Sequence, residues 1–119
     1  MDFVKRRSAR TILEAGCGTG MWVGLLRAAG ANVIGVDPSM GMLTQASARL
    51  GSSGLVLARA NELPFERKQF DLIYAVNAIH HFDDPQAFIS SAAALLNPRG
   101  TLAVIGIDPR TIRRRYLYE

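Results

Sequence analysis

The sequence predicts an α/β domain: a mainly parallel sheet of about five strands, in the order 3-2-1-4-5, with helices on both faces. Short apolar runs of about five residues alternate with longer segments of helical period, which is the pattern of βαβ units. A glycine-rich turn also joins the first apolar run to the first helical segment. Because such crossovers are right-handed, a doubly wound three-layer sandwich is the economical arrangement.

The first half of the chain contains three predicted strands and two predicted helices. Apolar residues predict strands at 11–14, 32–36 and 55–58. A helix is predicted over 21–29, and Gly30 fits its C-terminal end. Ser39 is a suitable N-cap for the second helix, which Gly51 ends. Its apolar residues share one face at a period of 3.6, and they are Met42, Leu43, Ala46 and Leu50.

The second half predicts two further strands around one helix. Residues 61–69 are polar and contain Pro64, which cannot continue a strand ladder, so this stretch is predicted as a loop. Strands are predicted at 70–76 and 101–107. Asp83 or Asp84 is expected to cap the helix between them, with Pro85 at its first position. The helix is predicted to bury Phe88, Ala92, Leu95 and Leu96 and to stop at residues 97–100.

Length and composition exclude several classes of protein. A chain of 119 residues allows one domain, predicted over residues 1–119 with its core at 11–109. The single cysteine, Cys17, excludes an internal disulfide, and two adjacent histidines disfavour a metal site. No apolar run approaches the roughly 20 residues that span a bilayer, and no signal peptide is indicated. We therefore predict no metal, no membrane span and a cytoplasmic location.

The net charge of +4 belongs to the two ends of the chain. Residues 1–10 and residues 110–119 each carry four basic residues against one acidic residue, a net +3. Residues 11–109 carry six basic and eight acidic residues, a net −2. A basic groove across the domain is therefore not indicated, and nucleic acid is not an expected partner. The run at 113–115 is expected to be a solvated helix face.

The strongest motif is the stretch from Leu13 to Gly20, which has glycines at 16, 18 and 20 between a strand and a helix. Without Cβ atoms, the backbone there can turn sharply and approach a ligand, and the helix N-terminus offers free N–H groups. Asp37 ends the second strand, 17 residues after Gly20. A carboxylate at that place can accept hydrogen bonds from the two hydroxyls of a ribose. The alternative for Asp37 is a local cap.

These motifs and three later ones resemble those of the class I S-adenosylmethionine-dependent methyltransferases. The later motifs are residues 35–39 with Met42 and Leu43, residues 63–65, and residues 70–73 with 80–82. The likeness is greatest to the small-molecule branch that includes ubiquinone and menaquinone methyltransferases, and it covers about 11–109. It implies a Rossmann-like fold, S-adenosylmethionine as cofactor, S-adenosylhomocysteine as product and a small-molecule methyl acceptor.

The resemblance also implies roles for individual residues. The glycines would lie beside the methionine part of the cofactor, with Glu14 facing its amino group and Asp37 holding the ribose. Pro38 and Met42 would pack on the adenine. The predicted cofactor-binding residues are Glu14, Gly16, Cys17, Gly18, Gly20, Asp37, Pro38, Met42, Ala60, Asn61, Ala75 and Asn77. Ala60 and Asn61 would lie at the adenine edge, and Ala75 and Asn77 near the methionine amino group and the methyl.

One residue departs from the family pattern. The family often has an acidic residue where Arg59 stands, and its carboxylate accepts from the adenine amino group. Arginine has no acceptor, so either Asn61 replaces this contact or adenine binding is weakened. The less favoured ligand is a nicotinamide dinucleotide, whose G-x-G-x-x-G fingerprint would need a glycine where Met21 stands.

No catalytic residue is assigned from the sequence. His81 is a candidate for placing the substrate or acting as a base, because histidine titrates near neutral pH. A packing or capping role for the pair at 80–81 is an equal alternative. Cys17 is expected to be a small residue suited to a crowded loop.

Compared with the family, the chain is short on the substrate side. The family domain normally continues after the fifth strand with another helix and two strands, and it carries an N-terminal helical cap or an insertion. The fifth strand would then be an unpaired apolar edge, which residues 111–118 could cover as a short helix or an added strand. We expect the domain to form a homo-oligomer through this edge or through the C-terminal tail. Three functions stay open: a small-molecule methyltransferase, a cofactor-binding part or module without catalysis, and a structural α/β domain.

Overall fold

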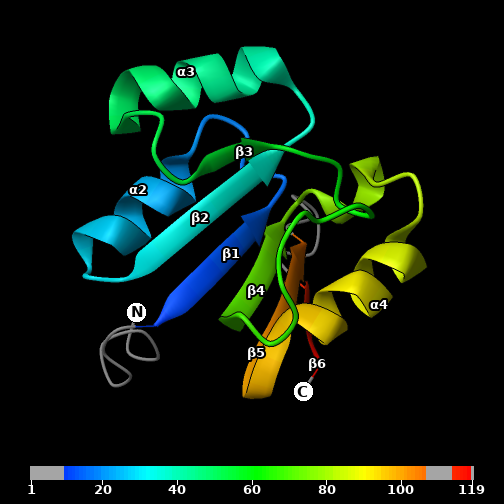
Figure 1. The fold of residues 1–119 in the computed structure, drawn as a ribbon. Coiled ribbons are helices and arrows are strands. Elements are labelled where there is room, and N and C mark those ends of the chain that lie inside the picture. Colours follow the sequence, from blue (N-terminus) through cyan, green and yellow to red (C-terminus); the bar gives the residue numbers. More distant parts are fainter. Residues whose placement is uncertain (1–9, 107–113, 119) are drawn as a thin grey trace.

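The computed structural model describes residues 10–106 and 114–118, and for His80 and residues 114–118 it describes the backbone alone. Within the described residues, ten elements follow one another, and Figure 1 shows their arrangement. They are β1 (Thr11–Ala15), α2 (Met21–Ala28), β2 (Asn32–Asp37), α3 (Met40–Leu50), β3 (Leu55–Leu57), β4 (Phe70–Val76), the 3₁₀ helix η1 (Ile79–His81), α4 (Pro85–Leu95), β5 (Leu96–Gly106) and β6 (Arg114–Tyr118). The predicted residue Ile107 and the basic segment 1–9 lie outside the described residues.

The strands form one sheet in the order β3-β2-β1-β4-β5-β6. Strands β1 to β5 pair in parallel, which confirms the predicted order 3-2-1-4-5. In the register of β1 with its neighbours, Glu14 lies opposite Gly35 of β2 and Tyr74 of β4. Because parallel strands end at the same edge, the loops after β1, β2, β3 and β4 gather there.

Helices cover both faces of the sheet, as Figure 1 shows, with α2 and α3 on one face and α4 on the other. Val23 and Leu26 of α2 and Leu43 of α3 pack with one buried cluster. Phe88, Ala92 and Leu95 of α4 pack with the other, as their helical spacing predicts. The alternating residues of the strands are divided between the two clusters, so this is the three-layer sandwich expected from the sequence.

The expected unpaired edge of β5 is absent, because β6 pairs antiparallel with it from Leu102 to Gly106. Of the two arrangements considered for residues 111–118, the added strand is therefore right for 114–118, and the helix is wrong. The two arginines at 114 and 115 belong to this strand rather than to a helix face, and residue 113 lies outside the described part. This pairing satisfies the backbone groups of β5 from Leu102 to Gly106, so the reason given for self-association through that part of the strand no longer applies.

The turn predicted at residues 97–100 lies inside β5, which begins at Leu96 rather than at Thr101. The helix ends at Leu95, before Leu96, which was predicted to belong to its buried face and is instead the first residue of β5. The register with β4 then jumps, since Phe70 is opposite Leu96 whereas Leu72 is opposite Thr101. The side chain of Asn97 donates to Asp71 Oδ1 at 2.8 Å, which ties the irregular stretch to β4.

Side-chain caps position two helices at the loop edge of the sheet. Ser39 Oγ accepts from the backbone N–H of Met42 at 3.2 Å, which confirms the predicted N-cap of α3. For α4 the cap is Asp84 rather than Asp83, since Asp84 Oδ1 accepts from the N–H of Ala87 at 3.1 Å. Within the described residues, no helix has the length and apolar character needed to cross a bilayer.

Candidate functional site

A cleft of about 580 Å³ opens at the edge where the parallel strands end. Its size is within the range of pockets that hold small molecules. Loops after four strands contribute to its wall. The lining residues are Gly16, Gly18, Asp37, Pro38, Ser39, Met42, Arg59, Ala60, Asn61, Val76, Asn77, Ala78, His81, Phe82 and Asp83.

Gly16 and Gly18 form the part of this wall that follows β1. Both have positive φ, of 74° and 57°, a conformation that favours glycine. The N–H groups of Gly16 and Cys17 both donate to the carbonyl of Val36, at 2.8 and 2.9 Å, which holds the turn against β2. A Cβ on Gly16 would lie 2.7 Å from Cβ of Ala78, whereas one on Gly18 would meet nothing within 4 Å. The loop therefore packs closely at Gly16 and opens to the cleft at Gly18.

Asp37 joins this glycine loop to the start of α3. Its side chain is buried, with 8% of the residue exposed. Oδ2 accepts from the N–H of Gly18 at 2.9 Å, and Oδ1 accepts from the N–H of Ser39 at 2.9 Å. A carboxylate oxygen can accept more than one hydrogen bond. Asp37 thus does form the local cap of the alternative interpretation, and it keeps acceptor capacity for a diol in the cleft.

Glu14 lies behind the cleft rather than in its wall. Only 2% of it is exposed, and Oε1 accepts from the hydroxyl of Tyr74 at 3.0 Å. Burial, and secondarily the charge of Asp37, raise the pKa of Glu14 to about 8 although the Tyr74 bond lowers it, so its carboxyl is protonated at neutral pH. Tyr74 was not predicted from the sequence as a partner of Glu14. The signal was available, because parallel pairing of two strands places residues of β4 beside residues of β1.

Cys17 is also turned away from the cleft. Burial raises the pKa of its thiol to about 12, and Glu14 and Asp37 add to this effect. A Cβ on Gly35 would lie 2.9 Å from Cys17 Sγ, so the thiol fills the space left by that glycine. Cys17 is therefore a small packing residue with a protonated thiol, in agreement with the expectation for a crowded loop.

The predicted residues of the α3 and β3 side do line the cleft, namely Pro38, Met42, Ala60 and Asn61. Met42 is 43% exposed, so it is not on the buried face of α3 where the helical pattern placed it. Arg59 lines the cleft as well, and its Nη1 lies 3.1 Å from Asp83 Oδ2. Neither the pairing of Arg59 nor Asp83 as a lining residue was predicted from the sequence.

On the β4 side, Asn77 lines the cleft in a left-handed conformation with φ of 54°. Its neighbours Val76 and Ala78 line it too, whereas Ala75 is fully buried in the core. Ala75 and Val76 are successive residues of β4 and point to opposite sides of the sheet, whereas Asn77 and Ala78 follow the end of the strand. Of the predicted set, Glu14, Cys17, Gly20 and Ala75 are thus absent from the lining. Gly20 is the N-cap of α2 with φ of 81°, and a Cβ there would lie 2.8 Å from the side chain of Leu50.

His81 is exposed at the end of η1 and lines the cleft. The next residue, Phe82, packs edge-on against Phe88 of α4 with ring centroids 4.9 Å apart, which anchors this loop to the core. Within residues 10–106 and 114–118, no three His, Cys, Asp or Glu side chains gather as metal ligands would.

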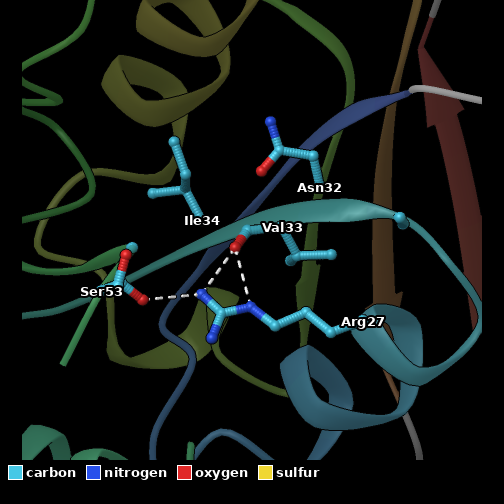
Figure 2. Close-up of a pocket in the computed structure, with 7 residues that line it drawn as sticks. Arg27, Asn32, Val33, Ile34 and Ser53 are labelled. Carbon is cyan, nitrogen blue, oxygen red and sulfur yellow. Dashed lines mark hydrogen bonds between the residues drawn. The ribbon is translucent and has the colours of Figure 1, made fainter. Parts of the chain in front are cut away.

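A smaller cavity of about 270 Å³ lies at the opposite ends of the strands, around Arg27 (Figure 2). Arg27 donates twice to the carbonyl of Val33, at 2.8 and 3.2 Å, and once to the carbonyl of Ser53 at 3.0 Å. These bonds join α2 to β2 and to the loop before β3. The guanidinium is committed to backbone groups, so its role here is structural.

Comparison with known proteins places the chain among methyltransferases. The sequence pattern of the Methyltransferase domain family matches residues 13–104. The chain is 35% identical over 100 residues to the ubiquinone biosynthesis O-methyltransferase of Rhodopseudomonas palustris strain TIE-1, covering 82% of the chain and 40% of that protein. It is 33% identical over 97 residues to the protein of the same name from Bradyrhizobium diazoefficiens, covering 78% and 38%.

The fold is also similar to that of solved methyltransferase structures. An S-adenosylmethionine-dependent methyltransferase from Mesorhizobium loti superimposes with a TM-score of 0.76 at 28% identity, over 86% of this chain and 49% of that one. The chain spans about two fifths of the length of the first curated relatives it matches. The shared part is the one that contains the glycine loop, Asp37 and the cleft.

Proposed function

The chain belongs to the class I S-adenosylmethionine-dependent methyltransferases, and from this premise we propose that its cleft binds S-adenosylmethionine. The family and the fold imply this cofactor. The observation that carries the proposal to particular residues is the bond between Asp37 Oδ2 and the N–H of Gly18. Through this bond a carboxylate and a stretch of backbone without Cβ atoms lie side by side in the cleft wall. The carboxylate suits the ribose of the cofactor, and the open backbone suits the methionine part attached to that ribose.

In this proposal Asp37 accepts hydrogen bonds from the two ribose hydroxyls. The methionine part lies along Gly16 and Gly18, where no Cβ stands between ligand and backbone. Pro38 and Met42, both exposed toward the cleft, provide apolar surface for the adenine. Glu14 lies behind the glycine loop and does not line the cleft. Its carboxyl is neutral at neutral pH, so it places no second negative charge near Asp37.

We propose that the chain is the cofactor-binding part of an enzyme that methylates a small molecule. The bound cofactor supplies an electrophilic methyl group on a sulfonium, and attack in line with the breaking bond makes positioning a large part of the rate. Asn77, His81 and Phe82 line the cleft on the β4 side, so they are the residues of this chain proposed to face the acceptor. The names of the curated relatives favour an oxygen as the accepting atom.

The domain is proposed to be one unit over residues 1–119. Among the described residues, a single six-stranded sheet separates two buried clusters, one on each face, which supports one folding unit. Self-association through a sheet edge would use β3 or β6, because these are the outer strands of the described sheet.

Calorimetric titration of the chain with S-adenosylmethionine and S-adenosylhomocysteine tests the proposal. Binding is expected for both ligands, and Asp37→Ala should lower both affinities at least tenfold because two hydrogen bonds to a charged group are lost. Glu62→Ala is the matched control, since Glu62 is exposed and outside the cleft wall. Absence of heat and of a thermal shift at millimolar ligand would refute cofactor binding. Equal affinities in wild type and Asp37→Ala would refute the role of Asp37.

A further inference from the structure

The sheet sets the order of groups along the cleft. From one end to the other lie the residues after β3, after β2, after β1 and after β4, because the strands are neighbours in that order. This inference rests on the proposed function, in which the ribose is held at Asp37 and the methionine part lies along the β1 glycines. The base is attached to the opposite side of the ribose, so it must lie toward the end of β3, where Arg59, Ala60 and Asn61 form the wall.

At that end the cleft wall also contains a carboxylate from the segment after β4, which begins at the other end of the cleft. Asp83 follows η1, after β4, yet its Oδ2 lies 3.1 Å from Nη1 of Arg59, after β3. The chain after β4 therefore crosses back over the cleft to the β3 side. Both side chains are largely exposed, at 65% for Arg59 and 71% for Asp83. An exposed ion pair of this kind adds little to the free energy of folding. We therefore ask what the two side chains could contact in the cleft.

The two residues offer different chemistry to a base. Arg59 has donors only, whereas a carboxylate has acceptors only. Among the described residues of the cleft wall, Asp37 and Asp83 are the carboxylates, and Asp37 is assigned to the ribose. Oδ1 of Asp83 has no partner in the described part of the chain, while Oδ2 is held by Arg59. The exocyclic amino group of adenine is a donor that needs such an acceptor.

We infer that Asp83, held in place by Arg59, accepts a hydrogen bond from the amino group of adenine and thereby selects adenosyl over other purine ligands. Asp83 contacts the ligand, and Arg59 is a positioning residue that acts through Asp83. Asn61 is the other side-chain acceptor on this side of the cleft, and the test must separate the two.

The test compares S-adenosylhomocysteine with its analogue that has a hydrogen atom in place of the 6-amino group of adenine. Calorimetric affinities are measured for wild type, Asp83→Ala, Asp83→Asn, Arg59→Ala and Asn61→Ala, with Glu62→Ala as the control. Wild type should prefer the adenosyl ligand by about tenfold, the worth of one charge-assisted hydrogen bond at an exposed site. Asp83→Ala should lose this preference by weakening only the adenosyl ligand. Asp83→Asn, which keeps an acceptor oxygen, should retain part of it.

Arg59→Ala should reduce the preference less than Asp83→Ala, because Asp83 remains but is no longer held. The double variant should then behave as Asp83→Ala does. The inference is overturned if Asp83→Ala keeps the preference, if it weakens both ligands equally, or if Asn61→Ala alone removes it. A wild-type chain that binds neither ligand would instead remove the proposed function. Thermal unfolding of each variant confirms that it is folded when measured.

Discussion

Glu14 and Tyr74 lie opposite each other in the pairing of β1 with β4 and are joined by a 3.0 Å hydrogen bond beneath the glycine loop. Burial raises the pKa of Glu14 to about 8 from an ordinary value of 4.5. The folded state therefore keeps a proton that the unfolded chain releases above about pH 4.5. The free energy of unfolding should fall as the pH rises from there to about 8, by up to roughly 1.4 kcal/mol per pH unit, and then level off.

Glu14→Gln should remove this contribution, since the amide cannot ionise in either state. Urea unfolding at pH 5, 6, 7 and 8 should show the variant gaining stability relative to wild type as the pH rises. Tyr74→Phe is the companion variant. It removes a bond that lowers the pKa of Glu14, so the levelling off should move to higher pH. A stability difference between Glu14→Gln and wild type that is constant with pH would contradict the assignment.

The buried thiol of Cys17 should be unreactive in the folded domain. Burial raises its pKa to about 12, and thiolate is the reactive species. Labelling with a thiol reagent at pH 8 should proceed only as fast as the domain opens, and it should reach the rate of a free thiol in urea. Because Cys17 is the only cysteine in the sequence, the signal is unambiguous. Fast labelling of the folded protein would show that the loop is open.

The sequence predicted strands β1 to β4, the order of the five parallel strands and the sheet edge where the cleft lies, because apolar runs, helical periods and right-handed crossovers determine them. It did not predict that β5 begins at Leu96, and it left open whether residues 114–118 form a helix or a strand. Asp37 lines the cleft as predicted, because a residue that ends a parallel strand lies at the edge where the loops gather. Its role toward a ligand stays a prediction. Ala75 illustrates the limit, because which residues at a strand end face the cleft depends on the exact point where the strand stops. The Arg59–Asp83 pair was beyond sequence reasoning, since it depends on how the loop after β4 folds back.

The cap of α4 should contribute to stability independently of ligand binding. Asp84 Oδ1 accepts from the N–H of Ala87, so Asp84→Ala should lower the free energy of unfolding by about 1 kcal/mol. Asp84→Asn keeps a side-chain acceptor and should cost much less. Urea unfolding of the three proteins checks this, and equal losses for Ala and Asn would show that the bond contributes little.

Alanine substitutions at three glycines with positive φ can distinguish the effects of backbone strain, close packing and lost space for a ligand. Gly30, Gly18 and Gly16 have φ of 98°, 57° and 74°. A Cβ would meet nothing within 4 Å at Gly30 or Gly18, whereas at Gly16 it would lie 2.7 Å from Cβ of Ala78. Alanine at each position should lower the free energy of unfolding by about 1 to 2 kcal/mol, because its Cβ disfavours the left-handed conformation. Only at Gly16 does it also force apart two loops of the cleft wall.

We therefore expect Gly30→Ala and Gly18→Ala to lose similar stability, and Gly16→Ala to lose about 1 to 3 kcal/mol more by overpacking. Gly30 is outside the cleft wall, so Gly30→Ala should keep its affinity for S-adenosylhomocysteine. Gly18→Ala should lose affinity despite its modest stability cost, because its methyl would occupy space at the cleft surface. Urea unfolding and calorimetry on the same samples separate these effects. If Gly18→Ala bound the ligand as tightly as Gly30→Ala does, the methionine part would not lie along this loop.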